Sequence, residues 1–259
     1  DGDKGLNTGG MGAVSPVPFA DEGFKDKILN QIIVPTVKGL KAEGLVYKGF
    51  IFFGIINVKG DPFVIEYNCR LGDPETEVII PRLKSDLLDL FEGVATNTLS
   101  ERDVQFEDRS AATVMMVSGG YPEEYQKGKV IYGLNGITES LVFHAGTSSD
   151  GPAVLSAGGR VLAVTSFGRN TENAVRRSYE TIEKIEFERA YFRRDIGKDL
   201  IYSSDFLFLN IKINELEEQS TSNNKKKWLK KLGIAGFLFF FIKGLVWIGI
   251  FVFAAKSCG

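Results

Sequence analysis

Three polar side chains at alternate positions, Glu66, Asn68 and Arg70, form the pattern with the clearest chemical use in this sequence. If the segment is extended, alternate side chains project to one face, and Tyr67 and Cys69 point the other way into packing. A carboxylate and an amide oxygen are hard ligands that suit a magnesium ion on phosphate oxygens, and a guanidinium can neutralise charge on a group in transfer. Alone the pattern is weak, because polar alternation also marks a solvated edge strand.

A glycine-rich loop near the start of the chain is the second candidate. Glycines let backbone N–H groups approach an anion closely, and polar side chains add further hydrogen bonds. The loop lacks the Lys-Ser/Thr ending of a Walker A motif, and an ordinary turn would look the same. Its candidate substrate-binding residues are Asn7, Thr8, Gly9, Gly10, Met11 and Gly12.

Composition excludes several classes of function. The formal net charge is −2, which argues against a broad nucleic-acid footprint. A single histidine, His144, excludes multi-histidine metal sites, so any metal here should be held by oxygen and be Mg²⁺ or Mn²⁺ rather than zinc. The two cysteines, Cys69 and Cys258, do not suggest a disulfide framework.

The two candidate stretches become specific when they are taken together. The loop Asn7–Ala13, followed about sixty residues later by Glu66–Thr76, closely resembles the phosphoribosylamine–glycine ligase family. The resemblance runs from Asp1 to about Tyr202 and then stops. Further motifs fit the family in the same order: Leu83–Leu87, Phe143–Thr147, Gly158–Leu162 and Tyr191–Gly197.

The resemblance implies an ATP-grasp ligase that joins glycine to 5-phosphoribosylamine in purine biosynthesis, by way of a glycyl phosphate, with ATP as co-substrate. It implies that Glu66 and Asn68 hold Mg²⁺ (or Mn²⁺) and that Arg70 steadies the acyl phosphate. Asp73 would help hold the substrate amine or glycine, and the glycine loop would line the pocket. For His144, a structural role at a domain junction and a substrate-side contact are both open.

The expected architecture is α+β, with residues 1–104 as part of an ATP-grasp domain around an antiparallel sheet and residues 105–202 as a small C-terminal domain. In the first part we expect a helix over 21–43 bent at Pro35, strands over 50–58 and 62–68, and a helix from Glu75 to Phe91. In the second part, strands are expected over 114–118, 140–144 and 160–165, and a helix over 170–185.

The last part of the chain differs in composition from the rest. Residues 203–231 read as a polar linker ending in a lysine cluster, and residues 232–255 are apolar except for Lys243. Roughly two dozen residues at about 1.5 Å each can cross a hydrocarbon core, so a single transmembrane helix is expected. A buried or interfacial helix is the alternative. The preceding lysines would keep the ligase part in the cytoplasm, and the helix would anchor it to the cytoplasmic membrane. The segment is either a true tether or the product of a separate gene joined to the ligase.

Two other functions stay open at this stage. Another ATP-grasp ligase, such as a carboxylase, shares the Glu-x-Asn-x-Arg pattern, although the Gly72–Glu75 continuation argues against it. A membrane-tethered, non-catalytic binding protein that reuses the scaffold is the second alternative.

The nucleotide-clasping half of the family's ATP-grasp domain would lie before residue 1. The chain alone should therefore bind ATP poorly and not catalyse ligation. Isothermal titration of residues 1–202 with ATP checks this expectation, and micromolar affinity would contradict it.

Overall fold

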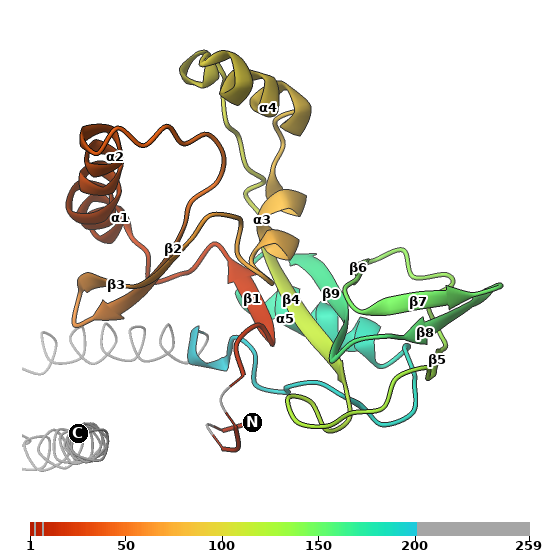
Figure 1. The fold of residues 1–259 in the computed structure, drawn as a ribbon. Coiled ribbons are helices and arrows are strands. Elements are labelled where there is room, and N and C mark those ends of the chain that lie inside the picture. Colours follow the sequence, from red (N-terminus) through yellow and green to blue (C-terminus); the bar gives the residue numbers. More distant parts are fainter. Residues whose placement is uncertain (3, 7, 201–259) are drawn as a thin grey trace, which may run out of the picture. The chain divides into compact units, whose positions relative to one another are not determined.

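A computed structural model describes residues 1–2, 4–6 and 8–200 of the chain (Figure 1). The predicted linker, residues 203–231, and the predicted membrane-spanning segment, residues 232–255, lie outside the described residues and stay predictions. Within the described part, no helix combines the length and apolar character needed to cross a bilayer.

The largest sheet places four strands in the order β1-β4-β9-β6, all antiparallel, and β10 also pairs with β4. Its two long central strands, β4 and β9, are buried along almost their whole length, and their apolar residues form much of the core. The strands are β1 (Gly12–Ser15), β4 (Ser110–Ser118), β6 (Leu141–His144), β9 (Arg160–Gly168) and β10 (Ala190–Tyr191). The strands expected over 114–118, 140–144 and 160–165 are confirmed, and β4 and β9 are longer than expected.

Helix α5 (Thr171–Ile182) packs against β4 and β9 (Figure 1). Asn170 caps its start, because the side-chain oxygen accepts a hydrogen bond from the Asn173 backbone N–H at 2.9 Å. The buried Ser178 hydroxyl donates to the Ala112 carbonyl at 2.8 Å, which fixes the helix on the sheet. The helix expected over 170–185 is thus confirmed, although it ends at Ile182.

A smaller sheet in the order β5-β8-β7 was not expected from the sequence. Its strands are short and carry little periodicity, which is why the sequence pattern did not reveal them. They are β5 (Val130–Ile131), β7 (Thr147–Asp150) and β8 (Ala153–Ser156).

The N-terminal part contains a hairpin of β2 (Phe52–Val58) and β3 (Asp61–Asn68), close to the two predicted strands. The hairpin turn is Lys59-Gly60, and both residues have positive φ (54° and 89°), as the tightest hairpin turns require. The register shifts between Gly54 and Ile55, so β2 carries an irregularity opposite β3.

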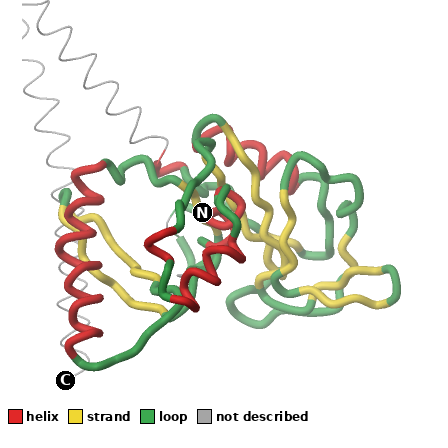
Figure 2. The backbone as a smooth tube through the Cα atoms, turned by 90° about the horizontal axis from the view of Figure 1, so that it is seen from above, coloured by secondary structure: helices red, strands yellow, loops and turns green. Residues whose placement is uncertain are grey.

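One helical run lies alongside this hairpin (Figure 2). It consists of α1 (Glu22–Ile28), a π-helical stretch over Leu29–Ile33, and α2 (Val34–Ala42), so the helix expected over 21–43 is confirmed as a run. The irregular stretch ends two residues before Pro35, whose ring lacks the N–H that a regular helix would use there.

The single helix expected from Glu75 to Phe91 is wrong. The structure has α3 (Thr76–Arg82) and α4 (Leu87–Thr96), separated by an extended Leu83 that pairs with Phe106. The second helix starts anew because the Asp86 carboxylate accepts hydrogen bonds from the first N–H groups of α4, at 2.8 and 3.3 Å.

Strand β1 crosses the domain boundary that the sequence suggested. It comes from the 1–104 part, yet it pairs with β4 in register Gly12↔Val114 to Ser15↔Ala111. The boundary at residue 104 stays a prediction, but the sheet of the C-terminal part includes a strand from the N-terminal segment.

Two facing threonines in the central strands have buried hydroxyls without a hydrogen-bond partner among the described residues. Thr113 and Thr165 are fully buried and lie opposite each other in the β4–β9 register. We expect Thr165→Val to stabilise the fold by about 1 kcal/mol. Valine has nearly the same shape as threonine, and the substitution removes the unpaired buried hydroxyl. Thermal unfolding of the full chain should show a Tm higher by roughly 2–4 °C.

Thr181→Val is the matched control for that substitution. Its hydroxyl is also buried, but it lies 2.6 Å from the Ser140 hydroxyl, so its loss should lower Tm. A fall in Tm for both variants would contradict the prediction.

Candidate active site

A cleft of about 450 Å³ brings the two sequence candidates together. Its walls include Gly9 and Gly10 from the N-terminal loop, Glu66 from β3, residues of the segment 70–75, and Arg160 at the start of β9. The cleft therefore joins segments that are far apart in the sequence.

Glu66 and Asn68 lie on the same face of β3, as the alternation predicts. The Asn68 side-chain amide donates to Glu66 Oε1 at 2.9 Å. Gly54 lies opposite Glu66 across the hairpin, and a Cβ at Gly54 would be only 2.9 Å from Glu66 Cγ. The missing side chain on β2 thus leaves room for the glutamate beside the cleft.

Arg70 lies beyond the end of β3 and also lines the cleft. Its guanidinium donates to the Leu71 carbonyl at 3.0 Å. Of the residues expected on the opposite face, Tyr67 packs edge-on against Phe53, with ring centroids 5.4 Å apart. Cys69 is exposed and Tyr67 is itself 52% exposed, so the expectation that these side chains point into packing is wrong for Cys69 and holds only in part for Tyr67.

The Glu66 and Asn68 side chains fit a magnesium ion whose remaining ligands come from the substrate. In the described part of the chain, no group of three or more His, Cys, Asp and Glu side chains is placed to hold a metal. Glu66 and Asn68 supply one carboxylate and one amide, and Mg²⁺ typically combines one or two such protein ligands with phosphate oxygens and water. The Asn68 amide must turn its oxygen toward the ion, which needs only a rotation about its last bond.

The glycine loop is held close to the cleft by backbone geometry. Gly10 has φ 77°, and a Cβ there would collide with the Arg160 guanidinium, so this position needs glycine on two grounds. Met11 is buried, and Gly12 begins β1. Thr8 precedes these residues in the loop, and Asn7 lies outside the described residues.

Asp73 is paired with an arginine that sequence reasoning did not include among the site residues. Arg160 donates to both carboxylate oxygens of Asp73, at 2.8 and 2.5 Å, and its Nη1 is also 3.4 Å from the Gly10 carbonyl. The sequence signal was the run Gly158-Gly159-Arg160, but only the fold reveals that it meets a residue 87 positions earlier.

Glu77, in the first turn of α3, follows the cleft segment 70–75 and has a shifted pKa. Burial raises the pKa of Glu77, and the negative charges of Asp73 and Glu75 add to the rise, while a backbone hydrogen bond and Arg160 act against it. Its Oε2 is buried without a hydrogen-bond partner among the described residues.

His144 lies at the end of β6 and is exposed. Its Nδ1 is 2.9 Å from the Thr147 hydroxyl, so its contact is with the adjacent turn. It does not line the cleft, and this arrangement favours the structural interpretation.

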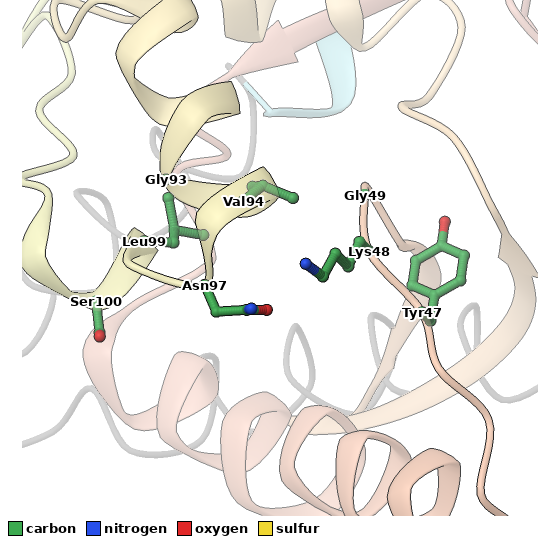
Figure 3. Close-up of a pocket in the computed structure, with 8 residues that line it drawn as sticks. All are labelled: Tyr47, Lys48, Gly49, Gly93, Val94, Asn97, Leu99 and Ser100. Atoms are coloured by element: carbon green, nitrogen blue, oxygen red, sulfur yellow. The ribbon is translucent and has the colours of Figure 1, made fainter.

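A second hollow of about 270 Å³ lies between the loop before β2 and the end of α4 (Figure 3). Lys48 reaches across it and donates to the Ala95 carbonyl at 2.8 Å. Most of its other lining groups are small or apolar, and it shares no residue with the cleft that holds Glu66 and Arg70.

Comparison with protein families gives two matches along the chain. Residues 1–76 match the model for the phosphoribosylglycinamide synthetase ATP-grasp (A) domain, and residues 111–199 match the model for its C domain. The chain carries the ATP-grasp and C domains of the phosphoribosylglycinamide synthetase family. The resemblance read from the glycine loop and the Glu66–Thr76 stretch is thereby confirmed at the level of the family.

Curated relatives agree with the domain matches. The phosphoribosylamine–glycine ligases of Allochromatium vinosum and Chlorobaculum tepidum are each 46% identical over 200 residues, which is 76% of this chain and 47% of each relative. The chain therefore spans about half the length of the curated relatives it matches.

Solved structures extend the comparison to the fold. The phosphoribosylamine–glycine ligase of Thermotoga maritima aligns with a TM-score of 0.64 and 36% identity, over 75% of this chain and 48% of that chain. The urea carboxylase of Kluyveromyces lactis aligns with a TM-score of 0.52 at 12% identity, over 78% of this chain and 17% of that chain. At that identity the likeness concerns the fold alone.

The raised pKa of Glu77 predicts a pH-dependent effect of its replacement. At low pH the carboxyl is neutral in both the folded and the unfolded state. As the pH rises, the unfolded chain releases this proton first, so the free energy of unfolding falls until the pH passes the folded-state pKa. We expect the Tm of Glu77→Gln to rise relative to the Tm of the wild type as the pH is raised from about 4 to about 7.

The measurement is Tm against pH for both proteins. Glu92→Gln, which removes an exposed carboxylate on α4, corrects for the general effect of the charge change. A Tm difference between Glu77→Gln and the wild type that stays constant with pH would contradict the prediction.

Proposed function

We propose that the chain forms part of a ligase that joins glycine to 5-phosphoribosylamine, using ATP, to give glycinamide ribonucleotide, ADP and phosphate. The observation that carries the proposal is the convergence of Glu66, Arg70 and the glycine loop on one cleft. This convergence occurs in a chain that has the ATP-grasp and C domains of the family and 46% identity to its ligases.

The reaction proceeds in two displacements. A carboxylate oxygen of glycine attacks the γ-phosphorus of ATP, ADP leaves, and glycyl phosphate forms. The amine nitrogen of phosphoribosylamine then attacks the glycyl carbonyl carbon and forms the amide bond. Phosphate leaves with the bonding electron pair, and the nitrogen releases one proton to phosphate or solvent. Both steps concentrate negative charge on phosphate oxygens, which positive groups placed in advance can stabilise.

The residues of the candidate site have the following roles in this scheme. Glu66 and Asn68 would hold Mg²⁺ (or Mn²⁺), and the ion would offset negative charge on the ATP phosphates. Arg70 lines the same cleft as Glu66 and neutralises charge on the acyl phosphate. The loop that contains Gly9 and Gly10 supplies backbone donors to the substrate.

Asp73 can contact the substrate while it is held by Arg160. The two oxygens of a carboxylate offer about four acceptor positions, and Arg160 uses two of them. The remaining positions can accept hydrogen bonds from the ammonium group of glycine or from the amine of the second substrate. The side chain of Asp73 is about half exposed, which leaves room for this contact.

The proposal is tested in a hybrid ligase, in which residues 1–200 of this chain replace the matching half of the Allochromatium vinosum enzyme. We expect the hybrid to form glycinamide ribonucleotide, measured by ADP release that depends on glycine and phosphoribosylamine. Glu66→Ala should lower kcat at least about a hundredfold, because it removes the only carboxylate assigned to the metal.

Asp61→Ala is the matched control, since Asp61 is an exposed carboxylate at the other end of the same strand. It pairs with Lys27 on the surface, and its removal should leave kcat nearly unchanged. Full activity of Glu66→Ala would refute the metal assignment. An inactive, folded hybrid would favour a non-catalytic binding protein.

A further inference from the structure

Arg160 connects three segments of the cleft that are remote in sequence. Its guanidinium binds both oxygens of Asp73 and lies 3.4 Å from the Gly10 carbonyl through Nη1. Nη1 is also 3.5 Å from the Asp73 carbonyl, at the outer limit of a hydrogen bond. One side chain from β9 therefore contacts both the glycine loop and the segment that contains Arg70.

The backbone that carries Arg160 is set in a close-packed junction of glycines. A Cβ at Gly146 would collide with the Arg160 carbonyl, and one at Gly158 would be 3.1 Å from Gly146 Cα. The Gly146 carbonyl accepts hydrogen bonds from Ala157 and Gly158, at 2.8 and 3.1 Å. This junction explains why glycines stand here in two of the motifs noted in the sequence, and it gives Arg160 a rigid base.

The neighbouring strand adds to that base. The Ser118 N–H donates to the Gly159 carbonyl at 2.8 Å, and the Ser118 hydroxyl donates to the Gly158 carbonyl at 2.9 Å. Ser118 is itself buried at the end of β4. The start of β9 is thus fixed to the sheet, and the guanidinium of Arg160 extends from it into the cleft.

We propose that Arg160 is a positioning residue of the cleft, which holds Asp73 and the glycine loop in place relative to Glu66 and Arg70. The catalytic part of this inference rests on the function proposed above. The structural part does not. The planar guanidinium matches the two oxygens of a carboxylate, whereas an ammonium group can serve only as a point charge. The geometry therefore requires arginine rather than any cation.

The first test uses the full chain and does not depend on activity. In Arg160→Ala and in Arg160→Lys, amide hydrogen exchange should rise about fivefold in peptides covering residues 8–12 and 70–76, the factor expected for a strong pair of this exposure. Exchange in the central strands β4 and β9 should stay unchanged in both variants.

Arg102→Ala is a closely matched control. Arg102 pairs with Asp89 at 2.9 Å, and the side chains of that pair are 25% and 50% exposed, against 26% and 49% for Arg160 and Asp73. Its loss should speed exchange near α4 and leave both cleft segments unchanged. Unchanged exchange of the cleft segments in Arg160→Ala would overturn the proposal. Unchanged exchange of these segments in Arg160→Lys would overturn the requirement for a planar guanidinium.

The second test uses the hybrid ligase. Arg160→Lys should raise KM for glycine or for phosphoribosylamine about tenfold and leave KM for ATP unchanged, since a displacement of about 1 Å costs up to a hundredfold. A purely structural role would lower the amount of active enzyme and leave all KM values unchanged, which would also overturn the proposal. If the wild-type hybrid does not ligate, the proposed function fails, and the exchange experiment alone decides the role of Arg160.

Discussion

The pairing of β4 with β1 on one side and β9 on the other determines where the cleft can form. Both neighbours run antiparallel to β4, so they run parallel to each other and begin at the same end of the sheet. Gly12 at the start of β1 lies opposite Val114, and Arg160 at the start of β9 lies opposite Val117. The glycine loop before β1 and the guanidinium at the start of β9 therefore meet, although about 150 residues separate them.

The chemistry of β3 was predictable because its signal is local. Alternation along an extended segment fixes which side chains share a face, and Glu66 and Asn68 do share one. The metal and substrate roles of these residues stay predictions. Arg160 was not predictable as part of the site, because its partner Asp73 is 87 residues away and no short-range pattern encodes such a contact. The run Gly158-Gly159-Arg160 indicated only that the position mattered to the family.

The errors in the fold have similar causes. Pro74 marked a helix start, and one helix was expected from Glu75 to Phe91. Asp86 instead provides a cap that starts a second helix, and Leu83 leaves the first helix to pair with Phe106. Cys69 was expected to be buried because alternation assigned it to an inner face, but that face of β3 is not covered, and its residues Ile65 and Tyr67 are exposed as well. Long, strongly apolar segments such as β4 and β9 were found, whereas the short strands β5, β7 and β8 were missed.

Strand β1 also has a practical consequence for work on the C-terminal domain. If that domain were excised near residue 105, the backbone of Ala111–Val114 would lose its partner along one edge of β4. These residues are fully buried in the intact chain, so the cut would expose an apolar, unpaired strand, which invites edge-to-edge aggregation. An expression fragment in which this edge of β4 stays paired must therefore include Gly12–Ser15, either in its natural place or joined to the excised domain by a linker.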